Sequence, residues 1–142
     1  MINVTKFAQE ITNHITINYK TMDNRRRVLI VEDNFDLAEA ARRFLELKRY
    51  KVIISDGGNL AEILVTQKPD IIIMDISLGA LDGRELCKNV KKDEHTKSIP
   101  VIMLSAHERL SKAYGDHCAD AYVMKPFALA ELLQTIESLL PA

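Results

Sequence analysis

Several reactive or charged side chains each follow a short apolar run in this sequence. They are Glu32 and Asp33 after residues 28–31, Asp75 after residues 71–74, Ser105 after residues 101–104, and Lys125 after residues 121–124. Three carboxylates brought close together raise one another's pKa unless a cation is present. A hard divalent ion such as Mg²⁺ meets that need with oxygen ligands. An amine and a hydroxyl suit the oxygens of a phosphoryl group, and a carboxylate can attack phosphorus to form an aspartyl phosphate.

The elements that must position these side chains alternate between two patterns along the chain. Apolar runs predict strands at residues 28–31, 51–55, 71–74, 101–104 and 121–124, and amphipathic segments predict helices at residues 35–48, 59–65, 81–92, 107–114 and 127–140. The continuous apolar character of the runs is typical of strands buried on both faces. We therefore predict an α/β fold with a doubly wound, five-stranded parallel sheet flanked by five helices. Ligands of such folds bind at the carboxyl ends of the strands, where all the singled-out side chains lie.

Length and composition exclude several other classes of protein. The chain has 142 residues, of which 19 are Lys or Arg and 20 are Asp or Glu, so its net charge of −1 indicates no direct nucleic-acid binding. The apolar runs are too short for membrane insertion, and the N-terminus does not read as a signal peptide. The two cysteines, Cys87 and Cys118, cannot form a disulfide framework. We interpret them as packing residues of a cytoplasmic protein.

The first 24 residues differ from the rest of the chain. Apolar residues recur there at helical spacing, at Val4, Phe7, Ala8, Ile11 and Ile15. A polar hinge at residues 23–27 follows. We therefore predict an N-terminal extension at residues 1–24, helical in structure, and one domain at residues 25–142. Docking on its own domain, pairing in a homodimer, and disorder all remain open for the extension.

From about residue 27 to residue 140 the chain resembles the response-regulator receiver domain of two-component signalling, which has a flavodoxin-like fold. The motifs that match are residues 28–33, 72–75, 82–83, 104–106 and 122–127. The resemblance implies that Asp75 accepts a phosphoryl group. It also implies that Asp33, Asp75 and the backbone carbonyl of Ser77 ligate Mg²⁺, with Mn²⁺ as an alternative. Glu32 would act mainly through water.

The same resemblance implies roles for further residues. Ser105 and Lys125 would hold the phosphoryl oxygens, and Ser105 and Tyr122 would form the conformational switch. Side chains at Ser77 and His107 flank the route by which water reaches the phosphoryl group, so they are candidates for setting its lifetime. Such a domain is not an enzyme acting on other substrates, because it catalyses only its own phosphorylation and dephosphorylation.

Three positions depart from the common pattern of the family. Gly79 stands where proline is usual, and Cys118 stands where a glycine often precedes the fifth strand. A cysteine at a position that needs a positive φ would be strained. Glu32 replaces the more frequent aspartate. None of these changes removes a chemical group that the reaction needs.

The expected partners are a histidine kinase or histidine phosphotransfer protein and an unknown downstream protein. Because the chain ends at Ala142, we expect a stand-alone regulator, acting as a phosphorelay shuttle or as a diffusible signal. A haloacid-dehalogenase type phosphatase needs a second aspartate where this chain has Ser77. A flavodoxin-like nucleotide site needs a phosphate loop where this chain is acidic. A pseudo-receiver that only binds a partner is the remaining alternative.

Overall fold

The structure, a computed structural model, describes residues 3–106 and 118–141, and for residues 14–22 it describes the backbone alone. In chain order the elements are α1 (Val4–Met22), β1 (Arg27–Val31), α2 (Phe35–Leu47), β2 (Lys51–Ser55), α3 (Leu60–Gln67), β3 (Ile71–Asp75), β4 (Ser77–Leu78), β5 (Leu81–Asp82), α4 (Gly83–Lys92), β6 (Val101–Ser105), β7 (Ala121–Met124) and α6 (Leu129–Leu139).

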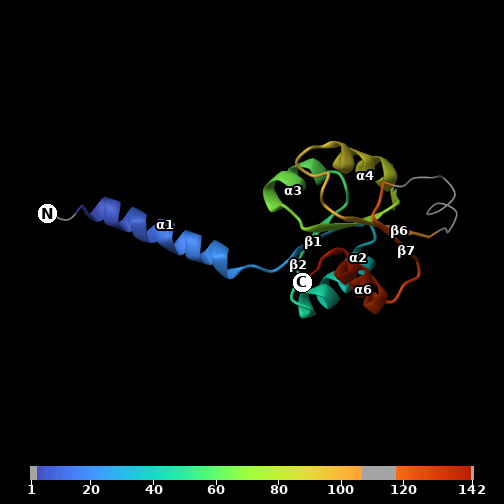
Figure 1. The fold of residues 1–142 in the computed structure, drawn as a ribbon, viewed down its shortest axis with the longest axis horizontal. Helices are drawn as coiled ribbons and strands as arrows, with labels where there is room; N and C mark the ends of the chain where they lie inside the picture. Colours follow the sequence, from blue (N-terminus) through green and yellow to red (C-terminus); the bar gives the residue numbers. More distant parts are fainter. Residues whose placement is uncertain (1–2, 107–117, 142) are drawn as a thin grey trace.

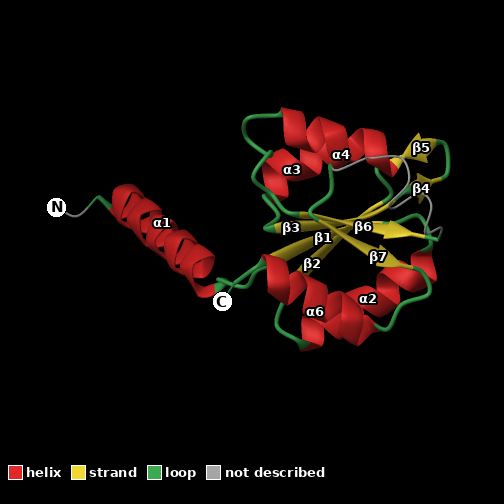
Figure 2. Ribbon diagram, turned by 45° about the vertical axis from the view of Figure 1, so that its right-hand side comes forward, coloured by secondary structure: helices red, strands yellow, loops and turns green. Residues whose placement is uncertain are grey.

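The centre of the fold is a five-stranded sheet in the order β2-β1-β3-β6-β7, and every pair of neighbouring strands is parallel. Figure 2 shows α3 and α4 on one face of this sheet and α2 and α6 on the other. The predicted doubly wound α/β fold is confirmed. The helix predicted at residues 107–114 lies outside the described residues.

Both faces of the sheet are buried, which explains why its strands are apolar throughout. Alternate residues of one strand enter two separate core clusters. Val28 and Ile30 of β1 pack with buried residues of α2 and α6, whereas Leu29 and Val31 pack with buried residues of α3 and α4. This arrangement holds the central strands rigidly from both sides, and their carboxyl ends are therefore well fixed.

Local polar contacts set where the helices begin. Asn34 caps α2 by accepting a hydrogen bond from the Leu37 N–H at 3.2 Å. Asn59 lies at the expected cap of α3, but its side chain accepts from the Ser55 hydroxyl at 2.7 Å and makes no cap hydrogen bond. The short β4–β5 pair was not predicted, and it delays the start of α4 from residue 81 to Gly83.

The predicted N-terminal helix is present as α1, which stands apart from the rest of the molecule (Figure 1). Asn3 caps it by accepting a hydrogen bond from the Lys6 N–H at 3.1 Å. Three of its apolar side chains, Val4, Phe7 and Ile11, are exposed. Among the described helices, none has both the length and the apolar character needed to cross a bilayer.

Candidate functional site

The carboxyl-terminal edge of the sheet brings together the side chains singled out from the sequence. Glu32 and Asp33 directly follow β1, Asp75 ends β3, Ser105 ends β6, and Lys125 follows β7. The register of the ladder explains their meeting, because β1, β3, β6 and β7 are consecutive parallel neighbours. Glu32, Asp75 and Ser105 are buried, while Asp33 is exposed and opens the group to solvent.

Three carboxylates form a compact acidic cluster at this edge. One oxygen from each of Glu32, Asp33 and Asp75 lies within 4.8 Å of the others. At such separations, in a partly buried site, the like charges repel strongly. An all-oxygen donor set of this kind fits a small hard divalent cation, which in proteins prefers one or two carboxylates and water.

Lys125 provides a positive charge inside this acidic cluster. Its Nζ donates to Asp75 Oδ2 at 2.6 Å and to Glu32 Oε2 at 3.2 Å. The lysine backbone is held as well, because its N–H donates to the Ser105 carbonyl at 2.8 Å. The Lys125–Pro126 peptide bond is cis. The amine therefore bridges the two buried carboxylates from a fixed position just after β7, which β6 separates from β3.

The environment raises the pKa of both Glu32 and Lys125. Burial of Glu32, followed by the nearby charge of Asp75, raises its pKa from 4.5 to about 7, although a hydrogen bond from the Asn34 N–H and the contact with Lys125 oppose the rise. Burial alone works to lower the pKa of Lys125, but its hydrogen bonds to Asp75 and Glu32 outweigh burial and raise that pKa. Lys125 therefore stays charged at neutral pH, while Glu32 titrates close to it.

The loop after β3 closes tightly around Asp75. The Ser77 N–H donates to Asp75 Oδ1 at 3.1 Å, so each carboxylate oxygen of Asp75 has a hydrogen-bond donor. Gly79 has a φ of 62°, which proline cannot adopt. Gly83 lies so close to the Asp75 carbonyl oxygen that a Cβ at this position would overlap it. The departure from the usual proline therefore fits the shape of this loop.

The two predicted switch residues lie on adjacent strands. Ser105 pairs with Met124 in the β6–β7 register, and Tyr122 pairs with Met103. Tyr122 is half-buried and packs against the core cluster on the face covered by α3 and α4. The other candidate for phosphoryl lifetime, His107, lies outside the described residues.

The end of β2 also belongs to the surroundings of the site, which the sequence analysis missed. A cavity of about 610 Å³ beside the acidic cluster is lined by Glu32 and Asp33 together with Ser55 and Asp56. The Ser55 carbonyl accepts a hydrogen bond from the Glu32 N–H at 3.0 Å. The sequence holds a sign of this, because β2 also ends in polar residues. Their position beside the site follows only from the strand order, which places β2 next to β1.

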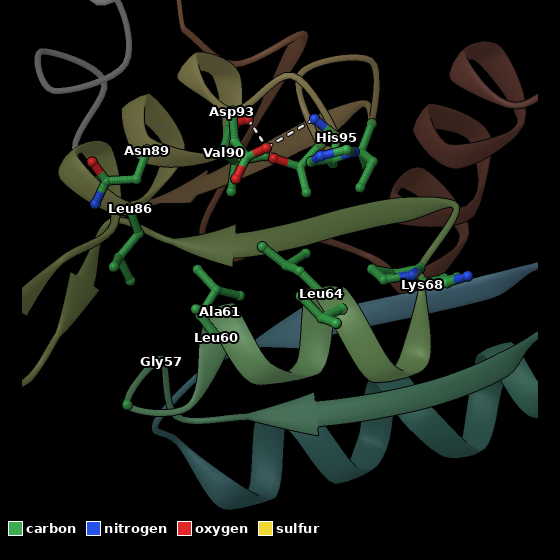
Figure 3. A pocket seen from close by; sticks show the side chains of 15 residues that line it. Gly57, Leu60, Ala61, Leu64, Lys68, Leu86, Asn89, Val90, Asp93 and His95 are labelled. Carbon is green, nitrogen blue, oxygen red and sulfur yellow. Dashed lines mark hydrogen bonds between the residues drawn. The ribbon is translucent and has the colours of Figure 1, made fainter.

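A larger cavity, of about 880 Å³, lies away from the acidic cluster and shares no lining residue with it. It lies between α3, which contributes Leu60 and Leu64, and α4, which contributes Leu86 and Val90 (Figure 3). Its lining contains none of the residues that the sequence singled out for chemistry. The charged side chains suited to chemistry lie instead at the sheet edge.

A comparison with protein families identifies the kind of domain that this edge belongs to. The model of the response regulator receiver domain matches residues 28–137. The chain belongs to this family. Receiver domains are phospho-accepting signalling domains of two-component systems, and they partner with histidine kinases or phosphotransfer proteins.

Curated relatives and solved structures agree with the family. Response regulator MprA of Mycolicibacterium vanbaalenii is 32% identical over 117 residues, covering 80% of this chain and 50% of the relative. The chain spans about half the length of the curated relatives it matches. Chemotaxis response regulator CheY4 of Vibrio cholerae has a TM-score of 0.75 at 26% identity, covering 82% of this chain and 100% of that one. TrrA of Thermotoga maritima, solved in complex with Mg²⁺-BeF, has a TM-score of 0.73 at 25% identity, covering 81% and 99%.

The raised pKa of Glu32 predicts how stability depends on pH in the metal-free receiver. The folded state retains a proton that the unfolded state releases above pH 4.5, so this contribution is complete below pH 4.5 and is lost as pH rises through about 7. We expect the free energy of unfolding to fall by on the order of 2 kcal/mol over this window. Urea unfolding in EDTA across this range measures it.

The matched variants for this measurement are Glu32→Gln and Glu131→Gln, the latter on the exposed side of α6. Glu32→Gln keeps the size of the side chain but cannot ionise, so it should flatten the pH profile. Glu131→Gln should retain the wild-type profile. Parallel profiles for wild type and Glu32→Gln would contradict the assignment of this titration to Glu32.

Proposed function

We propose that this receiver accepts a phosphoryl group on Asp75 from a phosphohistidine of a histidine kinase or phosphotransfer protein. The observation that carries the proposal is the position of the Asp75 carboxylate. It lies in the acidic cluster, with Lys125 Nζ 2.6 Å from one oxygen and the Ser77 N–H 3.1 Å from the other. These donors orient the carboxylate toward the opening at Asp33.

The residues around Asp75 can take part directly in this transfer, which depends on Mg²⁺. An Asp75 oxygen forms the new O–P bond while the N–P bond of the phosphohistidine breaks, and the imidazole nitrogen keeps that electron pair. Lys125, which donates a hydrogen bond to the Asp75 carboxylate before transfer, then donates to the phosphoryl oxygens. Ser105, at the end of β6, supplies a hydroxyl donor to the same oxygens. By the family resemblance, Ser77 and His107 are the candidates for setting how long the acyl phosphate lasts.

The metal proposal is that Asp33 and Asp75 bind Mg²⁺ directly, with the Ser77 backbone carbonyl as a third ligand and Glu32 acting through water. Mn²⁺ can take the same place. The hard oxygen donors within 4.8 Å of one another support it, and so does the likeness to TrrA, which was solved with Mg²⁺-BeF. When bound, the cation supplies positive charge that offsets the carboxylates and the phosphoryl oxygens.

The switch proposal rests on the contact between β6 and β7. Ser105 and Lys125 are joined by a backbone hydrogen bond of 2.8 Å, and Tyr122 lies on the same strand three residues before the lysine. When Ser105 donates to a phosphoryl oxygen, it vacates space toward which Tyr122 turns inward. Phosphorylation then favours a second conformation of the surface formed by β7 and α6, which is an ordinary population shift.

The domain proposal assigns residues 25–142 to the receiver and residues 1–24 to an extension that phosphorylation does not require. The family match begins at residue 28, and α1 stands apart from the sheet and its helices (Figure 1). Output takes place through contacts with a downstream protein. The exposed apolar side chains of α1 offer one surface for such contacts, either with a target or in a homodimer.

Replacing the acceptor tests the proposed function most directly. Asp75→Asn keeps the size of the side chain but loses the nucleophilic charge, so labelling by acetyl phosphate in the presence of Mg²⁺ should disappear. Phosphorus-dependent mass gain, or retardation on a phosphate-affinity gel, measures the labelling. The matched control is Asp56→Asn, an exposed aspartate that follows β2 at the same sheet edge. Labelling of folded Asp75→Asn at the wild-type rate would refute the assignment, and an unlabelled wild type would favour the pseudo-receiver.

Melting curves test the proposed metal site. Millimolar Mg²⁺ should raise the melting temperature because the ion binds the folded state. At a Mg²⁺ concentration ten times the Kd, binding adds about 1.4 kcal/mol to the free energy of unfolding. For a domain of this size that stabilisation is a rise of roughly 3–6 °C. Asp33→Ala should abolish the rise, whereas Asp36→Ala, an exposed aspartate in the first turn of α2, should keep it. An unchanged rise in Asp33→Ala would show that the ion binds elsewhere.

Backbone amide NMR tests the switch, with beryllofluoride as a phosphoryl mimic. Wild type should show shifts across residues 107–127 when the mimic binds. Ser105→Ala should reduce these chemical-shift changes by at least half, while Asp75 can still be labelled. The variant lacks the hydroxyl that couples the phosphoryl group to the conformational change. Ser98→Ala, at an exposed serine before β6, is the matched control. Wild-type shifts in Ser105→Ala would rule out this coupling.

A further inference from the structure

The two cysteines of the chain lie side by side, although they are separated by 31 residues in the sequence. The Sγ atoms of Cys87 and Cys118 are 2.8 Å apart. Cys87 lies on α4 and is fully buried, while Cys118, in the segment that leads into β7, is partly exposed. Both belong to the core cluster between the sheet and the helices α3 and α4. A disulfide needs an S–S distance of about 2.05 Å, so less than about 1 Å of movement separates the pair from bonding.

A second contact holds the same two segments together. Lys91, one helical turn after Cys87, donates to Asp120 Oδ2 at 2.8 Å, two residues after Cys118. Its Nζ also donates to the Ile99 carbonyl at 2.7 Å. Asp120 Oδ2 in turn accepts from the Val101 N–H at 2.8 Å. The segment before β7 is therefore tied both to α4 and to the start of β6, which keeps the sulfur atoms facing each other.

We propose that Cys87 and Cys118 form a reversible intramolecular disulfide when the protein meets a peroxide. The partly exposed Cys118 reacts first. Its thiolate bonds to one peroxide oxygen, the O–O bond breaks, and the other oxygen leaves as water after taking up a proton. Cys87 then attacks the Cys118 sulfenic acid, the S–O bond breaks, and the hydroxide leaves as water with the proton of Cys87. Two thiols and one peroxide give one disulfide and two waters.

The bond would join two elements that border the candidate site. It closes a chain loop that contains β6 with Ser105, and it fixes α4 to the segment that leads into β7 with Tyr122 and Lys125. Formation of the bond depends only on the geometry of the two thiols and on the oxidant. The inference is therefore independent of whether Asp75 accepts a phosphoryl group, and a thiol reductant reverses the modification.

Oxidation of the full chain followed by mass spectrometry tests the proposal. The reduced, folded protein is treated with hydrogen peroxide and then with an alkylating reagent under denaturing conditions. We expect a monomer lighter by about 2 Da that takes up no alkyl group and is restored by dithiothreitol. Non-reduced peptide mapping should join the peptides that contain the two cysteines. The melting temperature should rise on oxidation, since the cross-link restricts the unfolded chain.

Three variants sharpen the test. Cys118→Ser should give no mass loss and no rise in melting temperature with peroxide. Lys91→Ala removes the neighbouring tether and should slow disulfide formation several-fold. Lys92→Ala changes an exposed lysine of the same helix and should leave the rate unchanged. Sulfinic acid on Cys118 without a disulfide would overturn the proposal, and so would disulfide-linked dimers as the main product.

Discussion

Negative charge concentrated at one edge of a parallel sheet is the constraint on which the rest of this molecule depends. Oxygens of Glu32, Asp33 and Asp75 lie within 4.8 Å of one another, and two of these carboxylates are buried. The backbone ladder prevents them from separating, because each follows or ends a strand that is packed on both faces. Positive charge must come to them instead. Lys125 supplies one such charge, and the proposed divalent cation would supply more.

The surrounding structure makes this crowding tolerable. Both buried carboxylates share the amine of Lys125, and Glu32 relieves the remaining repulsion by titrating at about pH 7. The chain also turns sharply beneath Asp75, where Gly83 leaves room for the aspartate carbonyl and Gly79 adopts a φ of 62°. These glycines allow the loop to return close to the acidic cluster. The Asp75 carboxylate, which is the proposed phosphoryl acceptor, is therefore held in place by contacts within the protein itself.

The proposed phosphoryl switch and the proposed thiol pair meet on the same elements. Ser105, Tyr122 and Lys125 lie on or beside β6 and β7, and Cys118 lies in the segment that leads into β7. The Lys91–Asp120 ion pair fastens that segment to α4, whose first residue packs beneath Asp75. A chemical change at either place therefore acts on one connected unit, formed by α4, β6 and β7. The helices α2 and α6 on the opposite face pack against the same two strands, through Ile102 and Leu104 of β6 and Val123 of β7.

The sequence by itself determined the fold class and the membership of the site. Apolar runs predicted all five strands of the main sheet. The polar residues that follow or end these runs predicted which side chains meet at its edge. The family resemblance then suggested the roles proposed for Asp75 and its neighbours, which spacing alone left open. Tertiary structure decided what depends on strand order and packing: the raised pKa of Glu32, the β4–β5 pair, and the place of Ser55 beside the site. It alone brought Cys87 to Cys118, because a contact across 31 residues leaves no local pattern in the chain.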